Sequence, residues 1–212
     1  MTDNIDVFTH SSIRIRSDRG VIYADPFKMR EEPHDADYVF VTHEHYDHFS
    51  PEDIAKVSKE GTVLVVPESM KDKAVRDTGG KYTIVEASPE SSFKLDTISF
   101  ETVPAYNRLK PFHPRSAGWA GYVIDIGDEK IYIAGDTDLI AEARRVRCDV
   151  ALVPVGGTYT MNAKQAAELV NAIRPRTAIP THYGSVVGSE IDAEKFAAEV
   201  DPGISVDIIK QY

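Results

Sequence analysis

The chain has 212 residues, of which 42% are hydrophobic and 27% charged, a balance typical of globular proteins. A chain of this length can bury a sizeable core, and we expect one domain over residues 1–212. The 34 acidic residues outnumber the 24 basic ones and give a net charge of -10. This charge disfavours wrapping nucleic acid or binding an anionic membrane, so we expect a small-molecule partner.

Cysteine usage and the first residues predict a reducing, cytoplasmic location. Cys148 is the single cysteine of the sequence, so no disulfide can form within the chain. We expect it to be a packed small side chain. The first six residues contain acidic side chains and no basic segment before a long apolar stretch, and they do not resemble a signal peptide. No apolar run approaches the ~18 residues that span a bilayer.

The amino-terminal part predicts strands. Apolar and polar residues alternate over residues 5–9, 13–16 and 20–24. Asp18, Arg19 and Gly20 form a turn between the last two strands, which predicts a hairpin. Residues 38–41, Tyr-Val-Phe-Val, have no polar break and predict a buried strand.

Four potential metal ligands directly follow this buried strand. His43, His45, Asp47 and His48 lie within six residues, and such a cluster is costly to fold unless it holds metal ions. In an extended chain His43 and His45 point to one side, whereas the neighbours Asp47 and His48 must diverge. This arrangement favours two adjacent metal positions over one. The alternative is a set of surface histidines in a polar turn.

The pattern His-X-His-X-Asp-His after a hydrophobic strand resembles the signature of the metallo-β-lactamase superfamily of metal-dependent hydrolases. The resemblance implies an α/β fold, the four-layer αβ/βα sandwich. Three further segments, at residues 25–27, 104–107 and 156–159, look most like the ascorbate-phosphate lactonase-like branch. The resemblance spans nearly the whole chain and is specific for the metal site.

The elements after the cluster fit such a layered fold. Ser50 as N-cap, Pro51 at the first helical position and Asp53 at the capping-box site predict the start of a helix. Further helices are expected at residues 68–76, 139–146, 162–173 and 192–200, the third of them capped by Asn162 with Gln165 three residues on. Further strands are expected at residues 63–66, 83–85, 119–125, 130–134, 149–154, 177–180 and 206–209, with a strand pair between 92 and 103. The halves each run from strand-rich to helix-rich.

The resemblance implies two ligands further along the chain. Asp136 follows a strand in the context Gly-Asp-Thr, where the family places a carboxylate shared by two metals. An N-cap role is the alternative for Asp136, but Asp138 fits the cap of the helix at 139–146 better. His182 follows the strand at 177–180, where the family closes its second metal site with a histidine.

The remaining ligand departs from the family pattern. Many members carry a histidine directly after the strand that here leads into Ala105-Tyr106-Asn107. Asparagine is a poor ligand for a borderline-soft ion. His113 is the only histidine between the first cluster and Asp136, so we expect it to complete a three-histidine site.

Together these residues resemble a dinuclear hydrolase centre with Asp47 and Asp136 as catalytic carboxylates. The resemblance implies one ion on His43, His45 and His113, a second on Asp47, His48 and His182, and Asp136 as the bridge. We expect two divalent ions, Zn²⁺ with Mn²⁺ or Fe²⁺ as alternatives. A hydroxide between them would attack an ester, lactone, amide or phosphoester. An iron-dependent oxidoreductase on the same scaffold and a non-catalytic binding module are the alternative functions.

Basic residues near His113 suggest what the substrate carries. Arg108, Lys110 and Arg115 flank it in an otherwise acidic protein. With the loop at residues 156–160, they lead to the hypothesis of an anionic substrate bearing phosphate or carboxylate. A solvated basic loop and an ordinary turn are the alternative.

Several other polar or aromatic residues allow two interpretations. His10 and Asp25 match family segments near the first strands. They are either pocket residues that orient ligands, or a structural histidine and a turn aspartate. Tyr183 is either a substrate contact or a packing residue. No chemistry is assigned to Glu44 and Tyr46, which are expected to point away from the ligands, or to His34, which is expected to be solvated.

Overall fold

The first half of the chain builds a six-stranded sheet in the computed structural model, which describes residues 2–209. In spatial order its strands are β1 (Ile5–Val7), β2 (Ile13–Ser17), β3 (Gly20–Ala24), β4 (Ala36–Phe40), β5 (Ser58–Pro67) and β6 (Thr83–Ala87). Strands β1 to β3 pair antiparallel, and β3 to β6 pair parallel. The predicted hairpin is confirmed, with Ser17 opposite Gly20 across the turn.

The second half builds a seven-stranded sheet that also changes from antiparallel to parallel pairing. Its strands are β7 (Ser92–Lys94), β8 (Ser99–Pro104), β9 (Ala120–Asp125), β10 (Lys130–Ile133), β11 (Val150–Pro154), β12 (Thr177–Thr181) and β13 (Ser205–Val206), in spatial order from β13 to β7. Strands β7 to β10 pair antiparallel, and β10 to β13 pair parallel.

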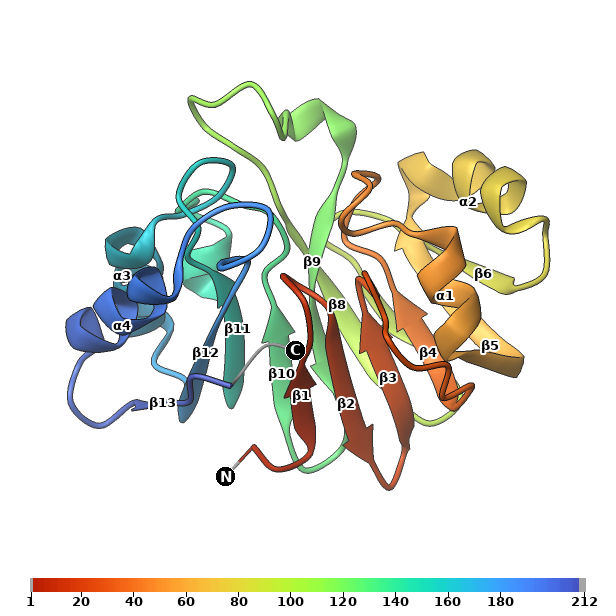
Figure 1. The fold of residues 1–212 in the computed structure, drawn as a ribbon, viewed down its shortest axis with the longest axis horizontal. Helices are drawn as coiled ribbons and strands as arrows, with labels where there is room; N and C mark the ends of the chain where they lie inside the picture. The colour runs from red at the N-terminus through yellow and green to blue at the C-terminus, as the bar shows by residue number, and fades with distance from the viewer. Residues whose placement is uncertain (1, 210–212) are drawn as a thin grey trace.

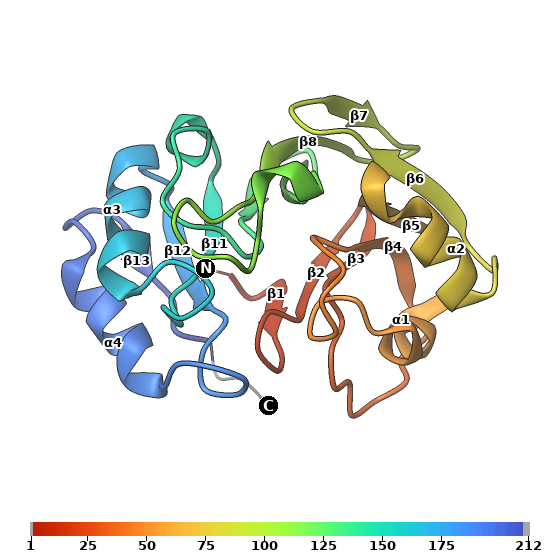
Figure 2. The same ribbon diagram turned by 90° about the horizontal axis from the view of Figure 1, so that it is seen from above.

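Helices cover the outer face of each sheet (Figure 1). On the first sheet lie α1 (Pro51–Val57) and α2 (Lys71–Thr78), and on the second lie α3 (Ala163–Ile173) and α4 (Glu190–Glu199). Short 3₁₀ turns occur at Glu68–Met70, Arg115–Ala117 and Ala143–Arg145. Figure 2 shows the layers from above, helices, sheet, sheet and helices in turn. The predicted four-layer αβ/βα sandwich is confirmed.

The two sheets share one hydrophobic core. The ring of Phe40 packs edge-on against Phe100 and Tyr122, with centroids 5.1 Å apart in both pairs. The Tyr122 hydroxyl also donates a hydrogen bond of 2.7 Å to the carbonyl of Val41, at the end of the buried strand. These contacts fix the loop after β4 relative to the second sheet.

Two predicted helix starts are confirmed by their caps. The Ser50 hydroxyl accepts a hydrogen bond from the Asp53 backbone N–H at the start of α1, with Pro51 in the first turn. Asn162 and Gln165 form a reciprocal capping box at the start of α3. Among residues 2–209, no helix is long and apolar enough to cross a bilayer.

The predicted helix over residues 139–146 is wrong, because the segment makes one 3₁₀ turn, Ala143–Arg145. Its buried residues, Ile140, Ala143 and Val146, recur every three positions, which suits the 3₁₀ geometry. Asp138 does not cap a helix there, because its carboxylate accepts hydrogen bonds from another loop. The last strand is shorter than predicted and ends at Val206.

Gly121 on β9 permits close approach to the end of β10, just before the segment that carries Asp136. A Cβ atom at Gly121 would lie 2.6 Å from the carbonyl oxygens of both Ile133 and Ala134. We expect Gly121→Ala to lower the free energy of unfolding by ~2 kcal/mol. The melting temperature should then fall by ~4–8 °C in thermal unfolding.

Glu101→Ala, on an exposed position of neighbouring β8, is the control and should change stability by no more than ~0.5 kcal/mol. An equal melting temperature for Gly121→Ala and the control would show that β9 and β10 separate without cost, contrary to the prediction.

Candidate metal centre

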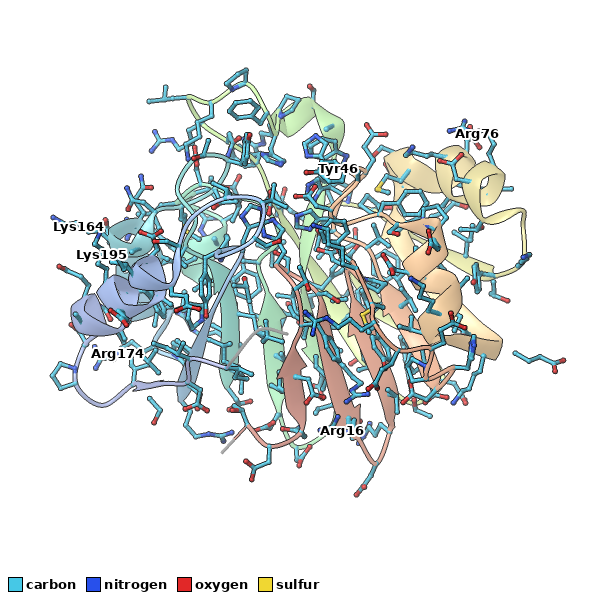
Figure 3. All side chains as sticks on the ribbon, in the orientation of Figure 1. Arg16, Tyr46, Arg76, Lys164, Arg174 and Lys195 are labelled. Atoms are coloured by element: carbon cyan, nitrogen blue, oxygen red, sulfur yellow. The ribbon has the colours of Figure 1, made fainter. Side chains whose placement is uncertain are left out.

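The predicted ligands lie in loops at one edge of the sandwich. These loops follow β4, β8, β10 and β12, strands whose carboxyl ends meet at the same edge. Tyr46, within the first of these loops, lies near the top of the view in Figure 3. Four stretches far apart in the sequence therefore supply one site.

The structure brings all seven predicted ligands together. Their ligand atoms form groups within which every pair lies within 4.8 Å. The groups are His43, His45 and His113; His43, His48 and Asp136; and Asp47, His48 and His182, joined by His10. The first and last match the two ligand sets implied by the sequence, and Asp136 lies between them.

Asp47 and His48 do not diverge as expected, since they belong to the same group. The extended geometry assumed for the motif ends at His45, whose carbonyl accepts hydrogen bonds from the backbone N–H of His48 and Phe49. This turn replaces the alternation of a strand and directs neighbouring side chains to one side.

Asp136 is the centre of the cluster. Its Oδ2 lies 3.0 Å from His182 Nε2 and 3.3 Å from His113 Nε2, and its Oδ1 lies 3.3 Å from His48 Nε2. The carboxylate is buried, and Gly135, with φ of 63°, packs against Thr42 where the backbone turns toward it. Oδ2 thus lies close to a histidine of each ligand set, and Oδ1 faces His48 of the second set.

The donor atoms fit divalent metal ions. Among the described residues, several buried polar atoms have no hydrogen-bond partner: His48 Nε2, His113 Nε2, Asp136 Oδ1, and both ring nitrogens of His182. Buried polar atoms are nearly always bonded, and imidazole nitrogens and carboxylate oxygens are ligands of zinc and related ions. Ions bound between these groups would satisfy the atoms that the protein leaves unpaired.

The histidines of the cluster differ in pKa because their surroundings differ. Burial lowers the pKa of His43 well below its ordinary value, which keeps that imidazole neutral as a ligand must be. Burial also acts to lower the pKa of His48, but the carboxylates of Asp136 and Asp25 outweigh it and raise that pKa to about 9. A metal ion can take the place of that proton.

His10 lies inside the site. Its Nε2 is 3.2 Å from Asp47 Oδ2, and its ring centroid is 3.8 Å from that of His182. His10, Asp25 and His182 all have positive φ, at 66°, 46° and 59°, which is strained for residues with a side chain. Such strain persists where the surroundings hold the residues in place.

Asp25 orients His48 and the motif that precedes it. The carboxylate is buried and accepts hydrogen bonds from the Thr42 backbone N–H at 2.8 Å and the Thr42 hydroxyl at 2.7 Å. It also lies 2.7 Å from His48 Nδ1. Because an ionised carboxylate only accepts, Nδ1 donates and Nε2 is left to face the site.

We expect Asp25→Asn to weaken metal affinity by ~10–100-fold, because the charge that fixes the His48 tautomer is lost. Metal retained against a competing chelator measures the effect. Asp37→Asn is the control, since Asp37 accepts from the Val21 N–H in the same sheet but lies outside the ligand groups. Equal metal retention by both variants would show that Asp25 is structural.

Asn107, set aside as a ligand on sequence grounds, positions His113. Its Oδ1 lies 2.9 Å from His113 Nδ1, and its backbone N–H donates to the His113 carbonyl. Its Nδ2 donates to Asp138 Oδ1 and the Tyr159 carbonyl. The asparagine therefore acts on the site through the histidine, a role that the sequence analysis missed because the contact spans a loop.

The loop cations are engaged by carboxylates. Lys110 Nζ lies 2.7 Å from Asp138 Oδ1, and Arg115 lies 2.9 Å from Glu142 Oε1. Arg108 is exposed, and its backbone N–H also donates to Asp138. Two of the three side chains hypothesised to bind an anion thus already have acidic partners.

A cavity of about 220 Å³ opens onto the predicted ligands. It is lined by His45, Tyr46, Asp47, Phe112, His113, Asp136, Tyr159 and Val186. Tyr46 was expected to point away from the ligands and Phe112 was not considered, so both were missed. Tyr183 is buried in the core of the second sheet, which agrees with packing.

Comparisons with known proteins place this geometry in a family. The family described as "Beta-lactamase superfamily domain" matches residues 4–182. A metal-dependent hydrolase from Thermoplasma acidophilum is 34% identical over 189 residues, covering 84% of this chain and 82% of that protein.

Solved structures show the same fold. A metal-dependent hydrolase from Parabacteroides distasonis superposes with a TM-score of 0.80 at 28% identity, covering 98% of this chain and 93% of that one. CmlA, a diiron β-hydroxylase from Streptomyces venezuelae, has a TM-score of 0.76 at 15% identity, covering 96% of this chain and 52% of that one. The second likeness shows the fold alone. The ascorbate-phosphate lactonase-like branch stays a prediction.

Proposed function

This chain belongs to the metallo-β-lactamase superfamily of metal-dependent hydrolases, and we propose that it cleaves a small molecule with two divalent metal ions bound at this edge of the sandwich. The observation that carries the proposal is the convergence of seven ligating side chains on shared points. Several of their ring nitrogens and one carboxylate oxygen, Asp136 Oδ1, are buried and unbonded. Zinc is the ion that we expect, with manganese or iron as alternatives.

Each side chain has a defined role in this proposal. The first ion would be held by His43, His45 and His113, the second by Asp47, His48 and His182, and Asp136 would be shared. When bound, such ions lower the pKa of water and polarise the bond to be cleaved. Among the residues of the chain, Asp25 and Asn107 hold His48 and His113 in the orientation this requires.

Asp47 and Asp136 are the carboxylates that line the cavity, where a substrate would meet the ligands. Of the two, Asp47 would accept a proton from the attacking water and return it to the leaving group, whereas Asp136 would remain shared between the ions. Asp47 is steadied for this by His10, whose Nε2 lies 3.2 Å away. The bond cleaved is an ester, lactone, amide or phosphoester in this proposal.

The setting of the enzyme follows from its composition. We infer a small-molecule partner, with neither nucleic acid nor a membrane, from the net charge of -10, and a reducing, cytoplasmic location from the single Cys148. One domain over residues 1–212 is part of this proposal. Residues 1 and 210–212 lie outside the part of the chain that the structure describes.

The test is the metal content per chain, measured by elemental mass spectrometry after reconstitution with zinc, manganese or iron. About two ions per chain, with chelator-sensitive hydrolysis of esters, lactones, amides or phosphoesters, is the expected result. Iron-dependent oxygen uptake without hydrolysis would favour an oxidoreductase instead. Absence of bound metal after reconstitution would exclude the catalytic proposal.

A further inference from the structure

We propose that the substrate carries an uncharged aromatic group beside the bond that is cleaved, and that the cavity formed by Tyr46, Phe112, Tyr159 and Val186 binds this group. The inference rests on the proposed hydrolytic function and adds the substrate class. It replaces the hypothesis of an anionic substrate.

The lining of the cavity divides into two kinds of residue. His45, Asp47, His113 and Asp136 are predicted metal ligands, and Tyr46, Phe112, Tyr159 and Val186 present rings or a branched aliphatic chain. The four apolar side chains come from different loops, which follow β4, β8, β11 and β12. An apolar enclosure built from four loops directly beside reactive groups is the usual form of a small-molecule site.

Two of these aromatic rings are exposed to solvent. Tyr46 is 67% exposed and Phe112 is 42% exposed, although each would gain from burial. Phe112 is held edge-on against Tyr159 with centroids 4.7 Å apart, and Tyr46 leans on Phe27 with centroids 5.9 Å apart. Exposed apolar side chains grouped over a reactive site indicate a ligand that covers them.

The side chains that line the cavity give an anionic substituent no cationic partner. Among the described residues, the lining contains no lysine or arginine. Lys110 and Arg115, on the same loop as Phe112, are engaged by Asp138 and Glu142. A carboxylate or phosphate on the group bound in the cavity would be desolvated against rings without compensation.

The volume indicates the size of the part of the ligand that the cavity can cover. At about 220 Å³ the cavity is smaller than the ~300–1,000 Å³ typical of pockets for drug-sized ligands. An apolar cavity of ~150 Å³ is large enough for benzene. The cavity therefore suits one aromatic ring with a short attachment to the reacting group. Edge-to-face contact with Phe112 and Tyr159 would orient that ring.

The test compares three matched substrates in each bond class that the reconstituted enzyme hydrolyses. They carry a phenyl group, a methyl group or a 4-carboxyphenyl group at the same position near the bond, for example methyl phenylacetate, methyl propanoate and methyl (4-carboxyphenyl)acetate. We expect kcat/KM for the phenyl compound to exceed both others by at least ~10-fold, or ~1.4 kcal/mol. Phe112→Ala and Tyr159→Ala should each reduce this preference, and Tyr159→Phe should retain it.

Leu109→Ala is the matched control, because Leu109 lies on the same loop, is 96% exposed and does not line the cavity. It should keep the full preference. Preference for the 4-carboxyphenyl compound, lost in Arg108→Ala, would overturn the proposal in favour of anion recognition while leaving the hydrolase proposal intact. Equal turnover of all three substrates would overturn it as well.

A binding measurement separates failure of this proposal from failure of the hydrolytic function. Trp119 is the single tryptophan, and its ring lies 4.9 Å from that of His45 and 5.6 Å from that of His113. If no substrate is cleaved, saturable quenching of its fluorescence by benzamide, and not by acetamide or 4-carboxybenzamide, would still support an aromatic-binding cavity. No quenching by benzamide would overturn it.

Discussion

Asp136→Asn is expected to lower kcat/KM by ~10³-fold or more, a loss of ~4 kcal/mol of transition-state stabilisation. The substitution keeps the size of the side chain and removes its charge. Asp136 lies within 3.3 Å of ring nitrogens from His48, His113 and His182, so among residues 2–209 it is the one carboxylate that contacts histidines of both ligand sets. An amide cannot compensate the charge of two cations held between these groups.

Metal content and thermal unfolding distinguish this loss from misfolding. We expect Asp136→Asn to retain its fold but to bind fewer than two ions per chain. Asp128→Asn, an exposed substitution in the turn between β9 and β10, is the control and should match the parent protein in both measurements. Full metal content with full activity in Asp136→Asn would show that Asp136 is not a ligand shared by two ions.

The fold was predictable where local sequence and local structure agree. The caps at Ser50 and Asn162 each rest on residues three positions apart, and both are present. The buried strand before the His-X-His-X-Asp-His pattern ends where the pattern begins, so the position of these ligands at a sheet edge followed from residue order alone. Short-range patterns of this kind need no knowledge of tertiary contacts.

The predictions that were wrong concern residues whose contacts are distant in the sequence. Asp138 looked like a helix cap, but Lys110 and the backbone of Arg108 compete for its carboxylate across about thirty residues. The apolar spacing over residues 139–146 predicted a helix, yet three-residue recurrence with no cap produces a 3₁₀ turn. Tyr46 was assigned no chemistry because its exposure at a cavity mouth depends on loops that the sequence does not place.

The loop that carries His113 shows the same limit within the site. His113 was predicted as a ligand because it is the only histidine in the sequence between the first cluster and Asp136. The sequence did not predict the conformation of the loop that brings it there. In the structure this loop is held by Asn107, which contacts His113 with both its side chain and its backbone. A residue rejected as a ligand thus acts as the support of one.

His113→Ala is therefore expected to reduce metal content from about two ions per chain to about one, because the first ion would lose one of its three imidazoles and keep only two of them with a share of the Asp136 carboxylate. Activity should fall by ~10²-fold or more, since one ion cannot act on both the attacking and the leaving atoms. Asn107→Ala should weaken metal affinity by ~10–100-fold through loss of the bond that orients the imidazole.

The control for His113→Ala is His34→Ala, which also removes one histidine but from a position outside all three ligand groups. It should retain about two ions. If His113→Ala also retained two ions and full activity, the first ion would have to be held by His43 and His45 with Asp136. If Asn107→Ala instead lost metal as completely as His113→Ala, the asparagine would be needed to hold the whole loop. Asn107 also bonds to Asp138 and the Tyr159 carbonyl, so its loss could act on the whole loop or on His113 alone. Lys110→Met separates these two roles, because it removes a different bond to Asp138 and leaves the contact between Asn107 and His113 in place.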